Sequence, residues 1–83
     1  MVEQMHFLVE VPSIGQSIQY TVPVTLEVND CIQLMVNLIE KEYPGVHFAQ
    51  MPILIDVKSE SQLEGSVTIE NLPLLDGSKL ILL

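Results

Sequence analysis

The sequence predicts an α+β domain in which one helix packs on a mixed sheet of four to five strands, in the order β-β-α-β-(β)-β. Apolar and polar residues alternate along 5–11 and 18–28, which is typical of strands. Apolar residues then recur every three to four positions within 29–45, which is typical of a helix. Short apolar runs follow at 53–57 and 78–83. Because 83 residues suffice for one core, residues 1–83 are expected to form a single domain.

The first two strands are predicted to form a β-hairpin. MHFLVEV (5–11) alternates, and PSIGQS (12–17) supplies the Pro, Gly and Ser that are typical of turns. IQYTVPVTLEV (18–28) alternates again. Pro23 has no N–H to donate to a ladder, so its part of the strand is expected at a sheet edge or a bulge.

The helix is predicted over about 30–43. Asp30 and Gln33 have the spacing of a capping box, in which side chains satisfy the free N–H groups of the first turn. Pro44 cannot continue a helix, and Gly45 offers the conformational freedom that a chain reversal needs. The predicted inner face consists of Ile32, Met35, Val36, Ile39 and Tyr43.

The remaining elements are short. ILIDV (53–57) predicts a buried strand, and a further short strand is expected around 62–64. Thr68 is a candidate N-cap for a brief helical turn that ends at Pro73. The Asp-Gly pair at 76–77 predicts a tight turn before the last strand, SKLILL (78–83).

The charge of the chain is one-sided. Eleven acidic residues stand against three lysines, for a formal net charge of −8. A cationic surface is required for nucleic acid, and anionic membranes repel an acidic one, so we expect neither nucleic-acid binding nor membrane insertion. A protein partner, in particular a basic one, is expected instead. The single cysteine and the absence of a signal-peptide pattern indicate a cytoplasmic protein.

No pattern in the sequence predicts catalysis, a cofactor or a metal site, and we expect the chain not to be an enzyme. Cys31 falls in the first helical turn, where the helix dipole would activate a thiol, but a small buried hydrophobe is the favoured interpretation. His6 and His47 lie far from it in sequence and give no metal-ligand spacing with it. No glycine-rich phosphate loop is present.

The helix is apolar over a wider arc than one sheet requires, because Leu34 and Leu38 extend it at one edge. Two interpretations remain open. These leucines cover the loop that follows the helix, or they form a contact with a partner or with a second copy in a homodimer.

Three stretches resemble ubiquitin-like proteins: TLEV (25–28), QLE (62–64) and TIENLPLLDGSKLILL (68–83). With the element order, they are similar to the ubiquitin-like β-grasp over nearly the whole chain, and the resemblance implies that fold. The ending DG-x-x-L-x-L is most similar to the bacterial YukD/EsaB family, which is encoded with the type VII secretion machinery for WXG100 (ESAT-6-like) substrates. This resemblance implies a cytoplasmic accessory or regulatory protein that acts by contact.

The resemblance also implies where contact occurs. Ubiquitin carries its receptor-binding apolar patch on the outer face of the sheet, and by rough alignment the matching residues here are Leu54, Ile81 and Leu83. If Leu80 and Leu82 face the helix, alternation turns Ile81 and Leu83 outward. The alternative is that the register turns the three residues inward, or that they are scattered apolar residues without a role.

Ubiquitin and the sulfur carriers of the same fold end in a flexible Gly-Gly tail that threads into an activating enzyme. Here Leu83 directly follows strand residues, so the resemblance favours a non-conjugated protein-binding module. A ubiquitin-like modifier or sulfur carrier is the disfavoured alternative, and a structural homo-oligomeric subunit is a third.

Overall fold

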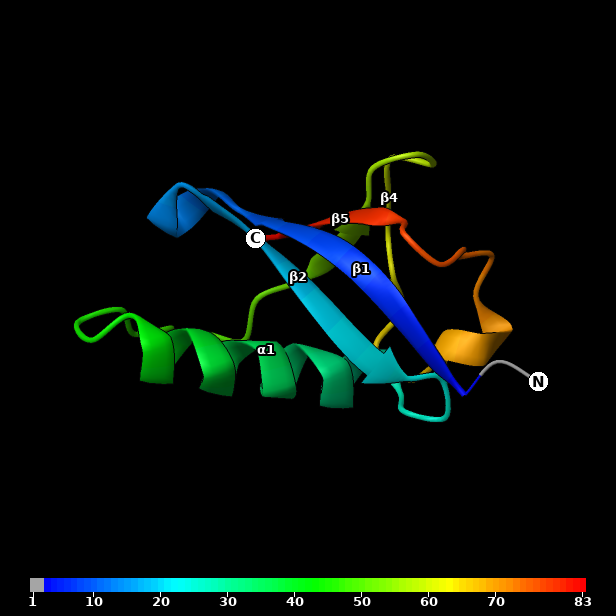
Figure 1. Ribbon diagram of the computed structural model, residues 1–83, viewed down its shortest axis with the longest axis horizontal. Coiled ribbons are helices and arrows are strands. Elements are labelled where there is room, and N and C mark those ends of the chain that lie inside the picture. Colours follow the sequence, from blue (N-terminus) through cyan, green and yellow to red (C-terminus); the bar gives the residue numbers. More distant parts are fainter. Residues whose placement is uncertain (1–2) are drawn as a thin grey trace.

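One helix lies across one face of a five-stranded sheet in the computed structural model, which describes residues 3–83 (Figure 1). In chain order the elements are β1 (Gln4–Val11), a 3₁₀ turn (Pro12–Ile14), β2 (Gln16–Pro23), α1 (Val28–Glu42), β3 (Leu54–Asp56), β4 (Ser61–Gln62), a second 3₁₀ turn (Ile69–Asn71) and β5 (Lys79–Leu82). The sheet order is β2-β1-β5-β3-β4, with β1 and β5 parallel and the other pairs antiparallel. The predicted α+β class, element order and short fourth strand are confirmed.

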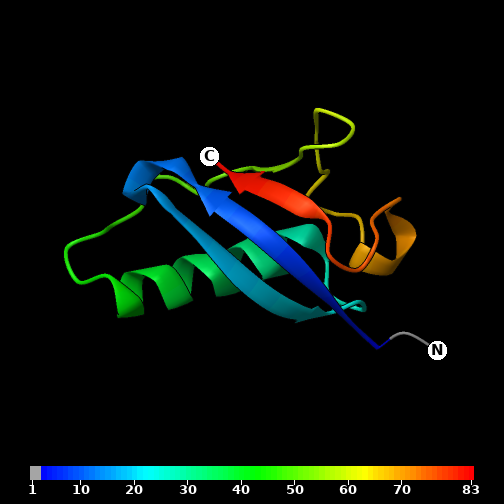
Figure 2. The ribbon, with the colours of Figure 1, turned by 45° about the horizontal axis from the view of Figure 1, so that its top comes forward.

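The core lies between the sheet and α1, which crosses the strands diagonally (Figure 2). The sheet contributes one side of each strand, and the helix contributes its apolar stripe. The buried apolar residues are Phe7, Val9, Val11, Tyr20, Val22, Val24, Val28, Cys31, Ile32, Met35, Val36, Ile39, Leu54, Leu63, Ile69, Leu74, Leu80 and Leu82. No helix within residues 3–83 combines the length and apolar character needed to cross a membrane.

The hairpin of β1 and β2 pairs along eight residues of each strand. Gly15 closes its turn with a φ of 64°, a left-handed conformation that costs glycine little. Pro23 is the last residue of an edge strand, as predicted. The predicted continuation of this strand to Val28 is wrong, because the chain turns after Pro23 and Val28 begins the helix.

The helix starts at Val28, two residues before the predicted start, and ends at Glu42. The predicted capping box is wrong, because no side chain caps the helix and Gln33 instead donates to Asn37 Oδ1 at 3.0 Å. The loop between β4 and the second 3₁₀ turn supplies backbone acceptors for the first turn of the helix. Val28 N–H donates to Val67 O, and Asn29 N–H donates to Gly65 O, each at 3.0 Å. The free N–H groups at the helix start are therefore satisfied by a segment distant in sequence.

Strand β5 lies near the middle of the sheet, and its leucines anchor the core. Leu80 and Leu82 are 0% and 1% exposed and face α1, as predicted. Leu54 pairs with Leu82 across the β3–β5 ladder, so it shares that face and is 1% exposed. The prediction that Leu54 lies on the outer face is therefore wrong.

Asp56, two residues after Leu54 on β3, also points inward and accepts hydrogen bonds from the turn that follows. The outer face of β3 therefore cannot be identified from the position of its polar residue.

Candidate protein-binding surfaces

The outer face of the sheet carries a group of apolar side chains, which we call the sheet patch: Leu8, Ile53, Ile55, Ile81 and Leu83. Ile55 and Ile81 are direct cross-strand partners on β3 and β5, and both are half-buried. Ile53 and Leu83 continue the same ladder by exchanging two backbone hydrogen bonds of 2.9 Å. Leu8 belongs to β1, next to β5, and lines a shallow hollow together with Ile81. Three neighbouring segments of the sheet therefore contribute to one continuous surface.

This surface is unusual for the side of a sheet that no helix covers. Such faces are ordinarily polar, because alternation directs the apolar residues to the core. Here Ile53 is 37% exposed, and Leu83 is 59% exposed. Glu10 and Lys79 lie at its border on the same face. An apolar group with a polar border is typical of a protein contact.

Two of the three residues predicted for this face, Ile81 and Leu83, lie on it, and the third does not. Ile55, which was not predicted from the sequence, occupies the position expected for Leu54. A shift of one residue reverses the face of every side chain in a strand. The signal that would have identified Ile55 is the pairing of β3 with β5, which puts Leu54 opposite the inward Leu82.

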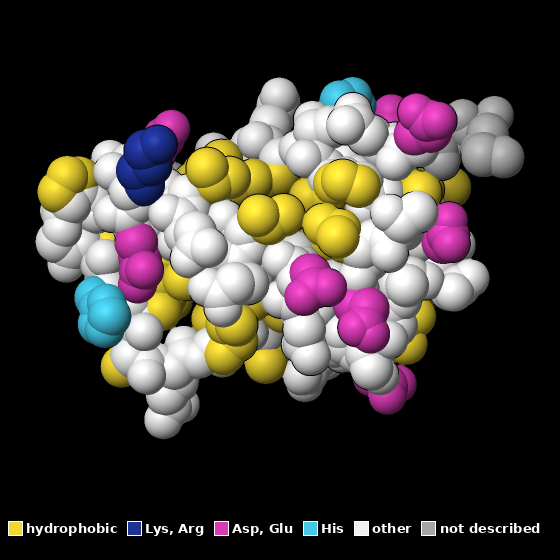
Figure 3. Space-filling model, turned by 90° about the horizontal axis from the view of Figure 1, so that it is seen from below, with side chains coloured by type: hydrophobic (Ala, Val, Ile, Leu, Met, Phe, Trp, Pro, Cys, Tyr) yellow, Lys and Arg dark blue, Asp and Glu magenta, His cyan; other side chains and the backbone are white. Residues whose placement is uncertain are grey.

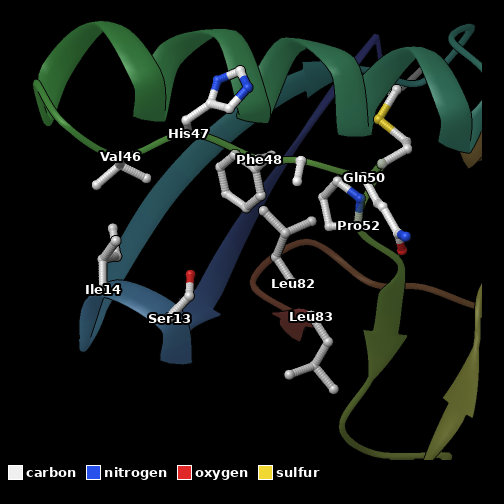
Figure 4. Close-up of a pocket in the computed structure, with 11 residues that line it drawn as sticks. Ser13, Ile14, Val46, His47, Phe48, Gln50, Pro52, Leu82 and Leu83 are labelled. Carbon is white, nitrogen blue, oxygen red and sulfur yellow. The ribbon is translucent and has the colours of Figure 1, made fainter.

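An open hollow of about 520 Å³ adjoins this face at the end of the sheet where the chain finishes (Figure 4). The hairpin turn, the loop after α1 and the end of β5 line it together; the residues are Ser13, Ile14, Val46, His47, Phe48, Ala49, Gln50, Met51, Pro52, Leu82 and Leu83. Its lining contains no lysine, arginine, aspartate or glutamate. Because Leu83 belongs to both, the hollow continues the sheet patch around the edge of the sheet.

Glu40 on α1 fixes the loop that forms one wall of this hollow. Its Oε2 accepts the backbone N–H of Phe48 at 3.0 Å and lies 3.2 Å from Nδ1 of His47. His47 is itself exposed, so its ring is available to a partner at the border of the hollow.

A second apolar surface lies on the side of α1 that faces the edge strand β2 (Figure 3). Leu34 and Leu38 are 44% and 47% exposed. Leu38 lines a hollow of about 140 Å³ with Ile18 and Tyr20 of β2.

The interpretation that Leu34 and Leu38 cover the loop after the helix is wrong. That loop runs along another side of α1, where Phe48 and Met51 border a hollow together with Gln33, Val36 and Glu40. The interpretation of the two leucines as a partner or dimer contact stays a prediction.

The thiol and the histidines are not brought together. Cys31 is 0% exposed, and burial, with a smaller contribution from Asp30, raises its pKa to about 11. A protonated, buried thiol is a poor nucleophile. His6 lies on the outer sheet face, where its Nδ1 is 2.6 Å from Thr21 Oγ1. Within residues 3–83, no group of three or more His, Cys, Asp or Glu side chains is placed to hold a metal ion.

Tyr20 and Cys31 make the fold sensitive to alkali. Burial, and then the Glu42 carboxylate, raises the pKa of Tyr20 from 10.0 to about 12. The unfolded chain therefore loses the phenol proton at a lower pH than the folded chain does. The stability linked to Tyr20 is complete below pH 10 and is lost as the pH rises toward 12, by roughly 2 to 3 kcal/mol in total.

We expect Tyr20→Phe to shift the alkaline unfolding midpoint to higher pH, as followed by far-UV circular dichroism between pH 8 and 12.5. Gln19→Ala, at an exposed and uncharged neighbour of Tyr20 on β2, serves as the control and should leave that midpoint in place. An unchanged midpoint in Tyr20→Phe would show that the phenol does not contribute to alkaline unfolding.

Comparisons with known proteins identify the fold. No family model and no curated protein match the chain. Among solved structures, one described by the words "Molecular Mimicry of SUMO promotes DNA repair" is similar at a TM-score of 0.79 and 14% identity, over 100% of this chain and 94% of that one. A protein designed de novo on the basis of ubiquitin is similar at a TM-score of 0.68 and 18% identity, over 96% of this chain and 87% of that one. The chain therefore has the ubiquitin-like β-grasp fold, as predicted from its sequence.

Proposed function

We propose that this ubiquitin-like module is a non-catalytic, non-conjugated protein that acts by binding a partner through the sheet patch, as an accessory or regulatory component of a bacterial type VII secretion system. The observation that carries the binding proposal is the sheet patch itself. Ile55 and Ile81 form a cross-strand apolar pair on a face that no helix covers. The fold alone does not imply a function, so the proposal rests on this surface.

The chemistry of the surface defines the partner. The sheet patch requires apolar side chains opposite it, and the adjoining hollow accommodates a bulky one beside Phe48 and Leu82. The net charge of −8 favours a partner with basic residues around that apolar centre, since complementary charge accelerates encounter and selects among partners. A protein surface meets both conditions.

The secretion role has separate support, namely the similarity of the segment DG-x-x-L-x-L (76–82) to the YukD/EsaB family. The order of neighbouring genes tests it directly: a membrane ATPase gene and genes for WXG100 proteins should lie beside the gene for this chain. If those genes are absent and the captured partner belongs to no secretion machinery, the secretion role is wrong. The proposal that the sheet patch binds a partner is tested by a separate experiment.

That experiment compares Ile55→Asp and Ile81→Asp with Gln4→Asp, a control with the same charge change at an exposed residue of β1 on the same face. The tagged proteins are used to capture partners from the source cells, and binding to the captured partner is then measured with purified components. We expect all three to fold by circular dichroism. The two patch variants should bind at least about tenfold more weakly, and Gln4→Asp should bind normally. Unchanged binding by folded Ile55→Asp and Ile81→Asp would refute the role of the sheet patch.

A further inference from the structure

Met51 carries the most exposed sulfur-containing side chain within residues 3–83. It is 52% exposed, whereas Met35 is 1% exposed and Cys31 is 0% exposed. Met5 is half-buried on β1 and packs against the core. An oxidant in solution reacts with the sulfur atoms that it can reach. The fold therefore shields the other sulfur atoms of this part of the chain and leaves Met51 accessible.

Met51 lies in the loop between α1 and β3, and residues 47–52 of this loop line two hollows. One is the hollow of about 520 Å³ where β5 ends, which we call the end hollow (Figure 4). The other has a volume of about 280 Å³ and lies between the loop and α1. Because Met51 lines both, a change in the polarity of its side chain alters both hollows.

Few hydrogen bonds hold this loop. Phe48 N–H donates to Glu40 Oε2 at 3.0 Å. Within residues 3–83, residues 47–52 take part in no backbone-to-backbone hydrogen bond. Segments with few hydrogen bonds adjust at a low cost in free energy. The loop therefore accommodates a more polar group at position 51 without unfolding of the core.

Oxidation by a peroxide makes the side chain of Met51 polar. The sulfur atom attacks one oxygen of hydrogen peroxide, and the O–O bond breaks. The sulfur loses two electrons and becomes a sulfoxide, while the departing hydroxide takes the proton of the transferred oxygen and leaves as water. A methionine sulfoxide reductase reverses the change: a dithiol is oxidised to a disulfide, and the sulfoxide oxygen leaves as water.

The sulfoxide fits an open end hollow better than a filled one. Water hydrates the sulfoxide oxygen while the hollow is open. An apolar side chain that fills the hollow displaces this water, and a hydrogen-bond acceptor that is buried without a donor is destabilising. The lining contains no lysine or arginine that would replace the water. The thioether has no such requirement, since it is apolar and flexible.

We propose that Met51 is a reversible oxidation site that controls the end hollow. The thioether form admits an apolar side chain of a partner, and the sulfoxide form excludes it. The inference rests on the proposed function, because the end hollow continues the sheet patch through Leu83. It adds to that function a regulation by peroxides, which weakens binding at the hollow and leaves the side chains of Ile55 and Ile81 unchanged.

The first experiment locates the oxidation. The 83-residue protein is treated with dilute hydrogen peroxide and cleaved after glutamate, which places each of its four methionines in a different peptide for mass spectrometry. We expect Met51 to be oxidised at least about tenfold faster than Met35, with Met5 between them, because accessibility sets the rate. In concentrated urea the three rates should become similar. Met1 lies outside the described residues, and its oxidation is followed in its own peptide.

The second experiment measures binding at the end hollow. N-acetyltryptophanamide, an uncharged mimic of an aromatic side chain, is titrated into the ¹⁵N-labelled protein. We expect binding that shifts the amide resonances of Ala49, Gln50 and Leu83. Conversion of Met51 to the sulfoxide should lower the affinity by roughly fivefold or more. Treatment with a methionine sulfoxide reductase should restore it.

Variants separate the oxidation of Met51 from other effects of peroxide. Met51→Leu keeps an apolar side chain without a sulfur atom, so its affinity for N-acetyltryptophanamide should be the same before and after peroxide. Met51→Gln introduces a polar group and should bind roughly fivefold more weakly without peroxide. Both replace an exposed side chain, so the fold is retained. Leu75→Gln, at a leucine that is 67% exposed in the loop before β5, is the matched control and should bind normally.

Three outcomes would overturn the proposal. One is oxidation of Met35 or Met5 as fast as that of Met51. Another is equal affinity of the reduced and oxidised proteins, or the same loss of affinity in peroxide-treated Met51→Leu as in the parent. The last is the absence of shifts around the end hollow at tens of millimolar N-acetyltryptophanamide. None of these results concerns the sheet patch, which the Ile55→Asp and Ile81→Asp variants test separately.

Discussion

Leu54→Asp is expected to unfold the domain, whereas Ile55→Asp is expected to leave it folded. Leu54 is 1% exposed, faces α1 and pairs with the buried Leu82, while Ile55 is half-buried on the outer face. A carboxylate at position 54 would be buried without a partner, at a cost of several kcal/mol. That cost is comparable to the whole stability of a domain of this size, roughly 4 to 12 kcal/mol. Far-UV circular dichroism and thermal melting of the two variants measure the difference.

The paired design separates the core from the surface, because the two substitutions are chemically similar and lie at neighbouring positions. A folded Leu54→Asp with a melting temperature near that of the parent would contradict the inward orientation of Leu54. An unfolded Ile55→Asp would show that Ile55 is needed for the fold, and Ile81→Asp alone would then test the sheet patch.

Leu82→Ala is expected to lower the free energy of unfolding by about 2 to 5 kcal/mol, and Leu83→Ala by no more than about 0.5 kcal/mol. Leu82 is 1% exposed within the core, so its truncation removes buried apolar area and leaves a cavity. Leu83 is 59% exposed, and its backbone pairing with Ile53 does not depend on the side chain. Urea unfolding, with the midpoint and slope fitted together, measures both changes.

The contrast between these variants has a second use. If the sheet patch binds a partner, Leu83→Ala weakens binding while preserving stability, whereas Leu82→Ala mainly reduces the amount of folded protein. Equal losses of stability in the two variants would contradict the alternation of β5, in which Leu82 faces α1 and Leu83 faces outward.

Much of the fold was predictable because its signals are local. The alternation along 5–11 and the change to helical spacing after residue 29 depend only on near neighbours in the chain. Pro23 predicted an edge because the lack of an N–H is a property of that residue alone. The inward direction of Leu80 and Leu82 followed from the same alternation.

The helix start was not predictable in the same way. Asp30 and Gln33 have the right spacing for a capping box, yet the first N–H groups of α1 bond to carbonyls of Gly65 and Val67. Those carbonyls lie more than thirty residues away in sequence. A motif that spans one helical turn cannot reveal a competing backbone acceptor that comes from a segment distant in sequence.

The candidate surfaces were predictable in part. Ile81 and Leu83 were assigned to the outer face correctly, but Leu54 was assigned to it in place of Ile55. The exposed leucines of α1 were identified from the width of its apolar arc. The proximity of these leucines to the edge strand β2 was not predicted. Neither the strand order nor the path of the loop after α1 can be derived from spacing alone.

The sequence by itself therefore determined the kinds of elements, their order, the acidic charge and the alternation of side chains between the two faces of each strand. Only the tertiary structure decided which face of β3 meets the helix, what satisfies the start of α1, and which edge of the sheet stays open. The physical reason is the range of the interactions. Periodicity and the chemistry of proline and glycine act within a few residues, whereas strand pairing joins β1 to β5 and β5 to β3 across long stretches of chain.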